Sequence, residues 1–454
     1  MADPTMSVTP YWELTFDADG DVDAGQRDRL LAGVKQRGVQ HLIVFSHGWN
    51  SDRSHATRLY SHFFAPIPVL APQAGIGYVG VVWPSMRFCD EPIPDFPHSA
   101  VVAPAPGLDD GTRQALLETF PGRAAVVERI ARLIDGRPPE DGELEEFGRL
   151  VRELVEVAPS GPQARCAADT LMDEELQDEQ DEQDEPEMLA GSTARACEEF
   201  ARALAGLESP AGAEGFALPN PWDGAKELLR QATYYAMKRR AGTVGERGLG
   251  PLIGRLAAAA PAVRVHLVGH SFGGRLVSFA LRGLPEGVQT VKSVTLLQGA
   301  FSHYAFAARL PFDGRAGGVL QGLQNRIDGP LVCCYSRFDE ALGTMYPLAS
   351  RMARDAQGLL EEGLLEEGRA VAELSIGGVL GAKWGAMGHD GVQAVPGTHA
   401  CTLAEALASP LPRSGCVNVD AEAVVRRGGA PAGAHSDIVH PELARVVLAA
   451  GRIH

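Results

Sequence analysis

Short apolar runs alternate with amphipathic stretches along most of this chain. The apolar runs have the length of buried strands and occupy positions 11–16, 41–45, 77–83, 265–268, 290–298, 330–335 and 416–419. Helical patterns begin near Gln26 and recur at 225–240 and 441–450. Strands that alternate with helices predict an α/β fold, with a mostly parallel central sheet covered by helices on both faces.

One of these runs leads into the most informative motif, Gly269-His270-Ser271-Phe272-Gly273-Gly274. The pattern Gly-x-Ser-x-Gly stands here between a predicted strand and a predicted helix. Such a sharp turn holds its central residue in a strained conformation with the side chain exposed. Glycines on both sides remove the Cβ atoms that would collide there. The motif therefore predicts Ser271 as a nucleophile, with the backbone N–H of Phe272 pointing at the same spot.

A second motif, Ser46-His47-Gly48-Trp49-Asn50, follows the predicted strand at 41–45. Gly48 would let the backbone turn its next amide toward the serine. We therefore predict that the N–H groups of Trp49 and Phe272 form an oxyanion hole. The alternative is an ordinary strand-to-helix loop in which His47 is structural.

Four landmarks together resemble serine hydrolases of the α/β-hydrolase fold, of a bacterial esterase-like or lipase-like type. These landmarks are residues 45–50, 81–85, 266–274 and 434–438. The resemblance covers about residues 10–85 and 222–454. It implies the hydrolase fold and the chain order oxyanion loop, serine, acid, histidine. It implies no substrate, because this fold hosts many chemistries.

The acid of such a site is expected after a later strand. Asp339 follows the predicted strand at 330–335 and stands where the resemblance places the acid. Glu340 is the adjacent alternative. A surface turn with solvated carboxylates would explain both residues without any chemistry.

The base is expected last, in the loop after the final strand. His435 lies in Gly433-Ala434-His435-Ser436-Asp437-Ile438, after the predicted strand at 416–419. Two other histidines are rivals for this role. His399 precedes the last strand, and His440 adjoins Pro441 at the start of the terminal helix.

About 180 residues separate Ser85 from the strand before the serine, although one crossover helix needs only a dozen or so. Residues 1–85 and 222–454 are therefore predicted to form the core, and 86–221 an insertion. Helical patterns occupy 113–133, 142–157 and 194–207. The insertion forms either a cap over the nucleophile, which we favour, or a peripheral decoration. A smaller insertion at 349–414 contains the duplicated Gly-Leu-Leu-Glu-Glu of 358–367, which we interpret as a helix extension.

Charge and composition limit the classes of function. The formal net charge is −17 over 454 residues, and ten acidic residues in 173–187 account for most of it. Because this segment has no basic residue and repels itself, we expect it to be disordered. The chain has no basic patch that would suggest nucleic acid. The chain contains no run of about 20 apolar residues, so we expect no membrane span.

Targeting and metal signals are weak. The N-terminus lacks a signal-peptide pattern and the seven cysteines are scattered, so we expect a cytoplasmic protein with reduced thiols. Residues 17–23 superficially resemble a calcium loop. Val22 and Asp28 stand where an EF-hand needs Gly and Glu, so we expect a turn into a helix instead.

These residues predict a serine hydrolase, with hydrolysis of a small-molecule or lipid carboxylic ester favoured. Ser271, His435 and Asp339 would act through an acyl-enzyme, without a metal or an organic cofactor. A thioesterase, an acyltransferase or a peptidase would use the same three residues. A non-catalytic binding module on the same fold is the hypothesis from another class. The sequence gives no oligomeric state.

Overall fold

The computed structural model describes residues 6–89, 107–156, 166–172, 189, 191–208, 220–342, 385–429 and 432–454. The acidic segment 173–187 and the duplicated segment 358–367 lie outside these residues. Within the described ranges, no helix combines the length and apolarity that crossing a membrane requires.

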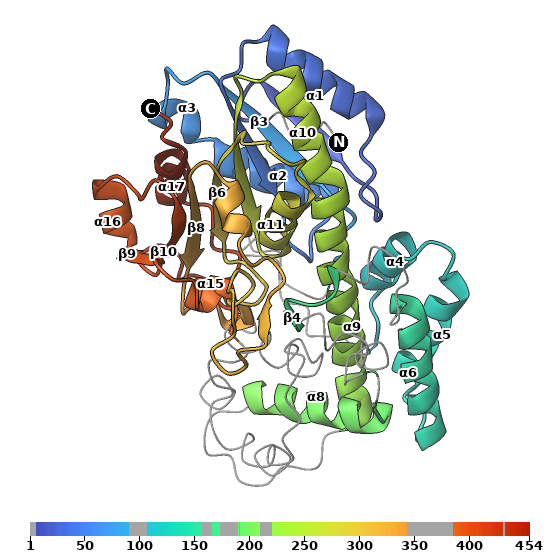
Figure 1. The fold of residues 1–454 in the computed structure, drawn as a ribbon. Coiled ribbons are helices and arrows are strands. Elements are labelled where there is room, and N and C mark those ends of the chain that lie inside the picture. Colours follow the sequence, from blue (N-terminus) through green and yellow to red (C-terminus); the bar gives the residue numbers. More distant parts are fainter. Residues whose placement is uncertain are drawn as a thin grey trace.

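An eight-stranded sheet forms the centre of the molecule, and every neighbouring pair of strands is parallel. The strand order is β1-β3-β2-β5-β6-β8-β10-β9. Helices surround the sheet, which confirms the predicted α/β class (Figure 1). The strands are β1 Tyr11–Thr15, β2 His41–Ser46, β3 Ile76–Val82, β5 Arg264–His270, β6 Val291–Leu297, β8 Pro330–Tyr335, β9 His399–Thr402 and β10 Gly415–Asp420.

Both faces of this sheet are buried, as the continuous apolar runs predict. On β2, Ile43 and Phe45 join one core, whereas Leu42 and Val44 join the other. Successive side chains point to opposite faces, so one strand serves both cores. The first core includes residues of α2 Arg53–Phe64, α3 Ile67–Leu70, α16 Leu403–Ala408 and α17 Pro441–Gly451. The second includes residues of α1 Ala24–Gln36, α9 Pro221–Thr243, α10 Gly250–Ala259 and α11 Phe272–Gly283.

The N-terminal acidic loop is a turn, as expected. Asp17 Oδ1 accepts hydrogen bonds from the N–H groups of Asp19 and Asp21, at 3.0 and 2.8 Å. Asp23 then caps α1 by accepting from the N–H of Gln26 at 2.7 Å.

The inserted region contributes helices beside the sheet. They are α4 Asp110–Thr119, α5 Ala124–Gly136, α6 Asp141–Val155 and α8 Thr193–Glu208. The single helical pattern at 113–133 is two helices, because Pro121-Gly122 interrupts it and Gly122 has φ +83°. A short antiparallel pair, β4 Thr170–Met172 with β7 Ala316–Gly318, ties the insertion to the core.

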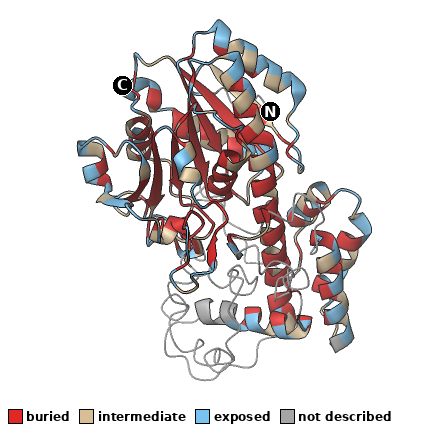
Figure 2. Ribbon diagram, in the orientation of Figure 1, coloured by how far each residue is buried: buried red, intermediate tan, exposed pale blue. Residues whose placement is uncertain are grey.

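The crossover helix predicted at 225–240 is longer and is buried over most of its surface. Helix α9 begins after Asn220, whose side chain accepts from the N–H of Trp222 at 2.9 Å. Figure 2 shows it lying between the sheet core and the inserted helices. It continues into α10 through the π-helical segment η3 Val244–Leu249. A Cβ on Gly245 would lie 2.1 Å from the carbonyl oxygen of Leu276, so this segment packs directly on α11.

Some elements gave no readable sequence signal. Strand β9 forms the sheet edge, inside the region 349–414 that was expected to be an insertion, and most of its residues are exposed. The 3₁₀ turn η4 Leu323–Arg326 and the one-turn helix α15 Met387–Asp390 are equally short. Elements this short carry no periodicity that a sequence can reveal.

A buried ionic cluster joins the insertion to the core. The Asp169 carboxylate contacts the Arg275 guanidinium of α11 and lies 3.1 Å from Lys238 Nζ of α9. It also accepts from the N–H of Ser302 at 2.9 Å. All three charged side chains are at most 1 % exposed. The cluster therefore fixes residues 166–172 against two helices and one loop.

Replacing Asp169 by Asn should destabilise the protein by about 3–5 kcal/mol, because it removes the carboxylate between two buried cations. Urea unfolding monitored by circular dichroism would measure this loss. The exposed pair Arg195–Glu199 on α8 gives a control, and Glu199→Gln should cost less than about 1 kcal/mol. Equal effects of the two substitutions would contradict a structural role for the buried cluster.

A pair of histidines is buried at the opposite end of the sheet from the serine. His41 Nδ1 lies 3.0 Å from His266 Nε2, and His266 Nδ1 lies 2.9 Å from Ser293 Oγ. Burial lowers the pKa of His266 to about 3. The folded protein therefore holds this imidazole neutral through a range in which the unfolded chain protonates it.

This difference predicts acid sensitivity. Between about pH 6.5 and pH 3 the unfolded state binds the extra proton, so stability falls as pH falls. His266 alone should cost about 2 kcal/mol by about pH 5. In His266→Gln, the loss of unfolding free energy between about pH 7 and pH 5 should shrink by that amount. The exposed His62 provides the control, and His62→Gln should keep the wild-type slope.

Candidate functional site

The site lies where the strand order reverses. From β2 the chain proceeds outward to β3, and after the long connection it returns to β5 on the other side of β2. Open α/β sheets bind ligands at the carboxyl ends of the strands that flank such a switch point. The residues after β2 are His47-Gly48-Trp49, and the residue after β5 is Ser271.

Ser271 occupies a strained turn between β5 and α11. Its φ is 54° and its ψ is −123°, a conformation that side-chain-bearing residues rarely adopt. Two glycines allow this geometry. A Cβ on Gly269 would lie 2.3 Å from the Gly273 carbonyl oxygen, and one on Gly273 would lie 2.0 Å from the Ser46 carbonyl oxygen. The turn thus matches the elbow expected from the sequence.

His435 lies directly against the serine. Its Nε2 is 2.9 Å from Ser271 Oγ, and its Nδ1 is 2.8 Å from Asp339 Oδ2. The carboxylate contact favours the tautomer with hydrogen on Nδ1, which leaves Nε2 to accept from the hydroxyl. A second histidine supports the loop, because His270 Nε2 lies 2.9 Å from the His435 carbonyl oxygen. Burial lowers the pKa of His270 to about 3, so it is a neutral donor to that carbonyl.

Asp339 is fully buried after β8, and three donors surround its carboxylate. Besides His435, Oδ1 accepts from the N–H of Leu342 at 3.0 Å, and Oδ2 lies 3.3 Å from Gln298 Nε2. Gln298 was not among the site residues predicted from the sequence. It follows β6, the neighbour of β8, and has φ 48°, which is unusual for its residue type. Its only sequence signal is its place at the end of a predicted strand.

The structure brings together the three residues predicted as nucleophile, base and acid, and leaves their rivals elsewhere. Glu340 is exposed. His399 lies in the edge strand β9 and is exposed. His440 precedes α17, where its Nε2 lies 2.9 Å from Asp437 Oδ1.

Gly48 lies against the serine. A Cβ there would come within 2.6 Å of Ser271 Cβ, so only glycine fits between this loop and the nucleophile. Among the described residues, the backbone N–H groups of Trp49 and Phe272 have no hydrogen-bond acceptor. Free amides are what an oxyanion hole needs, but the assignment of these two donors stays a prediction.

His47 holds the loop that contains Gly48 in place. Its Nδ1 lies 2.8 Å from the Gly48 carbonyl oxygen, and its ring stacks on Trp83 with centroids 5.5 Å apart. Its backbone carbonyl accepts from Trp83 Nε1 at 3.0 Å, and burial lowers its pKa to about 4. This imidazole is neutral and holds the loop that contains Gly48.

Aromatic rings form a wall beside the serine. The centroid of Tyr234, from α9, is 4.4 Å from that of Phe272 and 5.1 Å from that of Trp49. Phe88, from the start of the insertion, lies 6.1 Å from Trp49. The surroundings of the nucleophile are therefore largely apolar on this side.

The described part of the chain contains no group of three His, Cys, Asp or Glu side chains arranged to hold a metal ion. Neither models of known protein families, nor curated proteins, nor solved structures match this chain.

The geometry of the site predicts that Gly48→Ala disables the serine. The new methyl group would collide with Ser271 Cβ and displace either the nucleophile or the loop. We expect labelling of Ser271 by a fluorophosphonate to slow by about 100-fold or more, the scale of losing one oxyanion donor. Gly136, at the end of α5, has open space around its Cα. Gly136→Ala is therefore the control, and equal labelling rates in the two variants would contradict the close approach.

Proposed function

We propose that this protein is a serine hydrolase of the α/β-hydrolase fold, and that it hydrolyses carboxylic esters. The observation that carries the proposal is the unbroken chain of contacts from Ser271 through His435 to Asp339, on a strained turn at the switch point of the sheet. A buried carboxylate, an imidazole and a hydroxyl in this order activate a serine for acyl transfer.

In the proposed reaction, Ser271 Oγ attacks the ester carbonyl while His435 Nε2 takes the hydroxyl proton. Asp339 stabilises the imidazolium, and the N–H groups of Trp49 and Phe272 would receive the negative oxygen. The C–O bond of the ester then breaks, and His435 returns its proton to the leaving alkoxide. A water molecule deprotonated by the same imidazole releases the carboxylic acid and restores the serine.

The aromatic wall supports an apolar substrate. Tyr234 and Trp49 are partly exposed and offer ring surface, and the fully buried rings of Phe272 and Phe88 pack against them. Because Phe88 belongs to residues 86–221, this contact supports the proposal that the insertion borders the site. Small-molecule or lipid esters with an apolar acyl or alcohol group fit such surroundings better than highly charged substrates.

Hydrolysis of p-nitrophenyl esters of increasing chain length tests the proposal. Ser271→Ala and His435→Ala should each lower kcat by several orders of magnitude, since residues that act as a unit fail together. Asp339→Asn should cost roughly 10⁴-fold, because the imidazole loses its orienting carboxylate. Glu340→Gln, one residue away and exposed, is the matched control and should retain nearly full activity.

Fluorophosphonate labelling separates the alternatives. A folded wild-type protein that labels at Ser271 but cleaves no ester would direct the search to thioesters, amides or acyl transfer. A folded protein that neither labels nor cleaves esters would support the binding-module hypothesis and overturn the proposal.

A further inference from the structure

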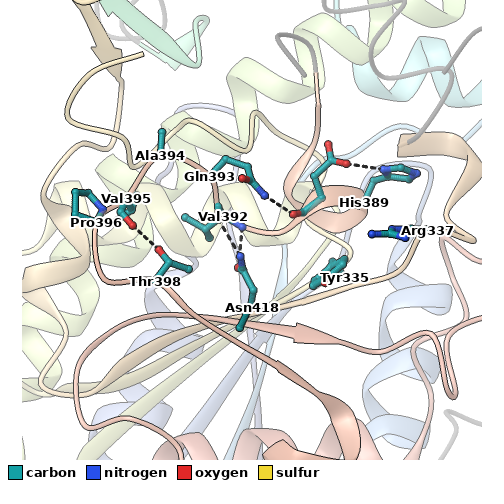
Figure 3. A pocket seen from close by; sticks show the side chains of 12 residues that line it. Tyr335, Arg337, His389, Val392, Gln393, Ala394, Val395, Pro396, Thr398 and Asn418 are labelled. Carbon is teal, nitrogen blue, oxygen red and sulfur yellow. Dashed lines mark hydrogen bonds and ion pairs between the residues drawn. The ribbon is translucent and has the colours of Figure 1, made fainter. Parts of the chain in front are cut away.

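A cavity of about 700 Å³ opens beside the carboxyl ends of β8 and β10 (Figure 3). Small-molecule sites have volumes in this range, and parallel sheets place them at this edge. Its lining comes from the end of β8 and the loop after it, from α15 and the loop after it, and from β9 and β10. Neither Ser271 nor His435 lines it.

One end of the cavity carries charged side chains of both signs. Arg337, His389 and Asp390 lie there together with Tyr335. Among the described residues, the Arg337 guanidinium pairs only with Glu422, with Nε 3.8 Å from Oε1. The Tyr335 hydroxyl and His389 Nε2 have no hydrogen-bond partner in the same ranges. Three donor groups are therefore left for a ligand.

The rest of the lining is apolar or already engaged. Asn418 holds the loop in place, because its Oδ1 accepts from the N–H of Val392 at 2.8 Å and its Nδ2 donates to the Val392 carbonyl at 3.0 Å. Gln393 Nε2 donates to the Asp390 carbonyl at 2.7 Å. Ala394 has φ 56°, and strained residues of this kind cluster at ligand-binding sites. The loop is a rigid wall rather than a set of free polar groups.

The negative charge of Asp390 is shared by two imidazoles. Its Oδ1 lies 2.8 Å from His389 Nδ1, and its Oδ2 lies 3.1 Å from His303 Nδ1. The hydrogen bond from Nδ1 to Asp390 raises the pKa of His389, against the opposing effect of burial. The neighbouring carboxylate thus favours a protonated His389, whose Nε2–H is left for a ligand.

We propose that this cavity binds a small organic anion, a carboxylate whose charged end lies between Arg337 and His389. Its apolar body would pack against Val395 and Pro396 at the other end of the cavity. A guanidinium and an imidazolium form charge-assisted hydrogen bonds with a carboxylate. The site is separate from the Ser271 site and does not depend on the proposed hydrolase activity.

The surrounding charges set the strength and the pH dependence. Besides Asp390, the groups that act on His389 are Asp339, which favours its protonation, and Arg337, which opposes it. Glu422 competes for Arg337, and Asp420 lies near Tyr335. These acids limit the affinity, so we expect dissociation constants in the millimolar range. The affinity should fall as pH rises, because His389 loses its proton.

An NMR titration with benzoate tests the site, with uncharged benzamide as the matched ligand. The titration uses the Ser271→Ala variant, which lacks the proposed nucleophile. Its result is therefore independent of the proposed hydrolase function. The signal is the Cε1–H resonance of His389, assigned by its loss in His389→Gln. We expect saturable shifts with benzoate at about pH 5.5, and at least tenfold weaker binding at about pH 8 and with benzamide.

Arg337→Gln should weaken benzoate binding at least tenfold, because it removes the permanent cation. The control is Arg413→Gln, which changes an exposed arginine just before β10, at the opposite end of that strand. Equal affinity for benzoate and benzamide would overturn the proposal. Unchanged binding in Arg337→Gln, or no saturable shift at all, would overturn it as well.

Discussion

The placement of α11, the helix that begins after Ser271, depends on the ion pairs of the buried Asp169 carboxylate. It has no exposure to water and contacts Arg275 of α11, Lys238 of α9 and the backbone of Ser302. Arg275 stands four residues after Ser271, so one charge contact links the inserted region to the helix that starts at the serine. Buried charges are tolerated only with partners. The contacts of Asp169 therefore tie residues 166–172 of the insertion to the core.

Helix α9 also carries buried cations that bind other segments. Its consecutive cations Lys238, Arg239 and Arg240 each engage a different segment. Arg239 donates to the carbonyls at the end of α6, and Arg240 donates to the carbonyls of Pro84 and Thr119, at 2.8 and 3.4 Å. Guanidinium groups at these helix ends satisfy carbonyls that the helices leave unpaired. The helix is thus a buried connector, which explains why it lacks the one-sided apolar face of a surface helix.

The sequence predicted the features that depend on long apolar runs and on backbone constraint. Strands β2, β5 and β8 are mostly apolar segments, and the elbow requires glycine at 269 and 273. It could not predict Gln298, because a single amide at the end of a strand has no pattern. It missed β9 because a short exposed edge strand shows no alternation. The sequence could not predict the role of Asp169, because its partner Arg275 lies 106 positions away and no local sequence pattern connects the two residues.

Two sites lie at the carboxyl edge of the sheet, the Ser271 site with its buried Asp339 and the cavity lined by His389. Both are connected to Gly388 of α15. The carbonyl oxygen of Gly388 in α15 accepts from the N–H of Ser336 at 3.0 Å and from Gln298 Nε2 at 3.1 Å. The same Gln298 reaches Asp339, while the residue after Gly388, His389, lines the cavity beside β8 and β10. The loop that carries the buried acid and the helix that lines the cavity are thus joined through one amide side chain.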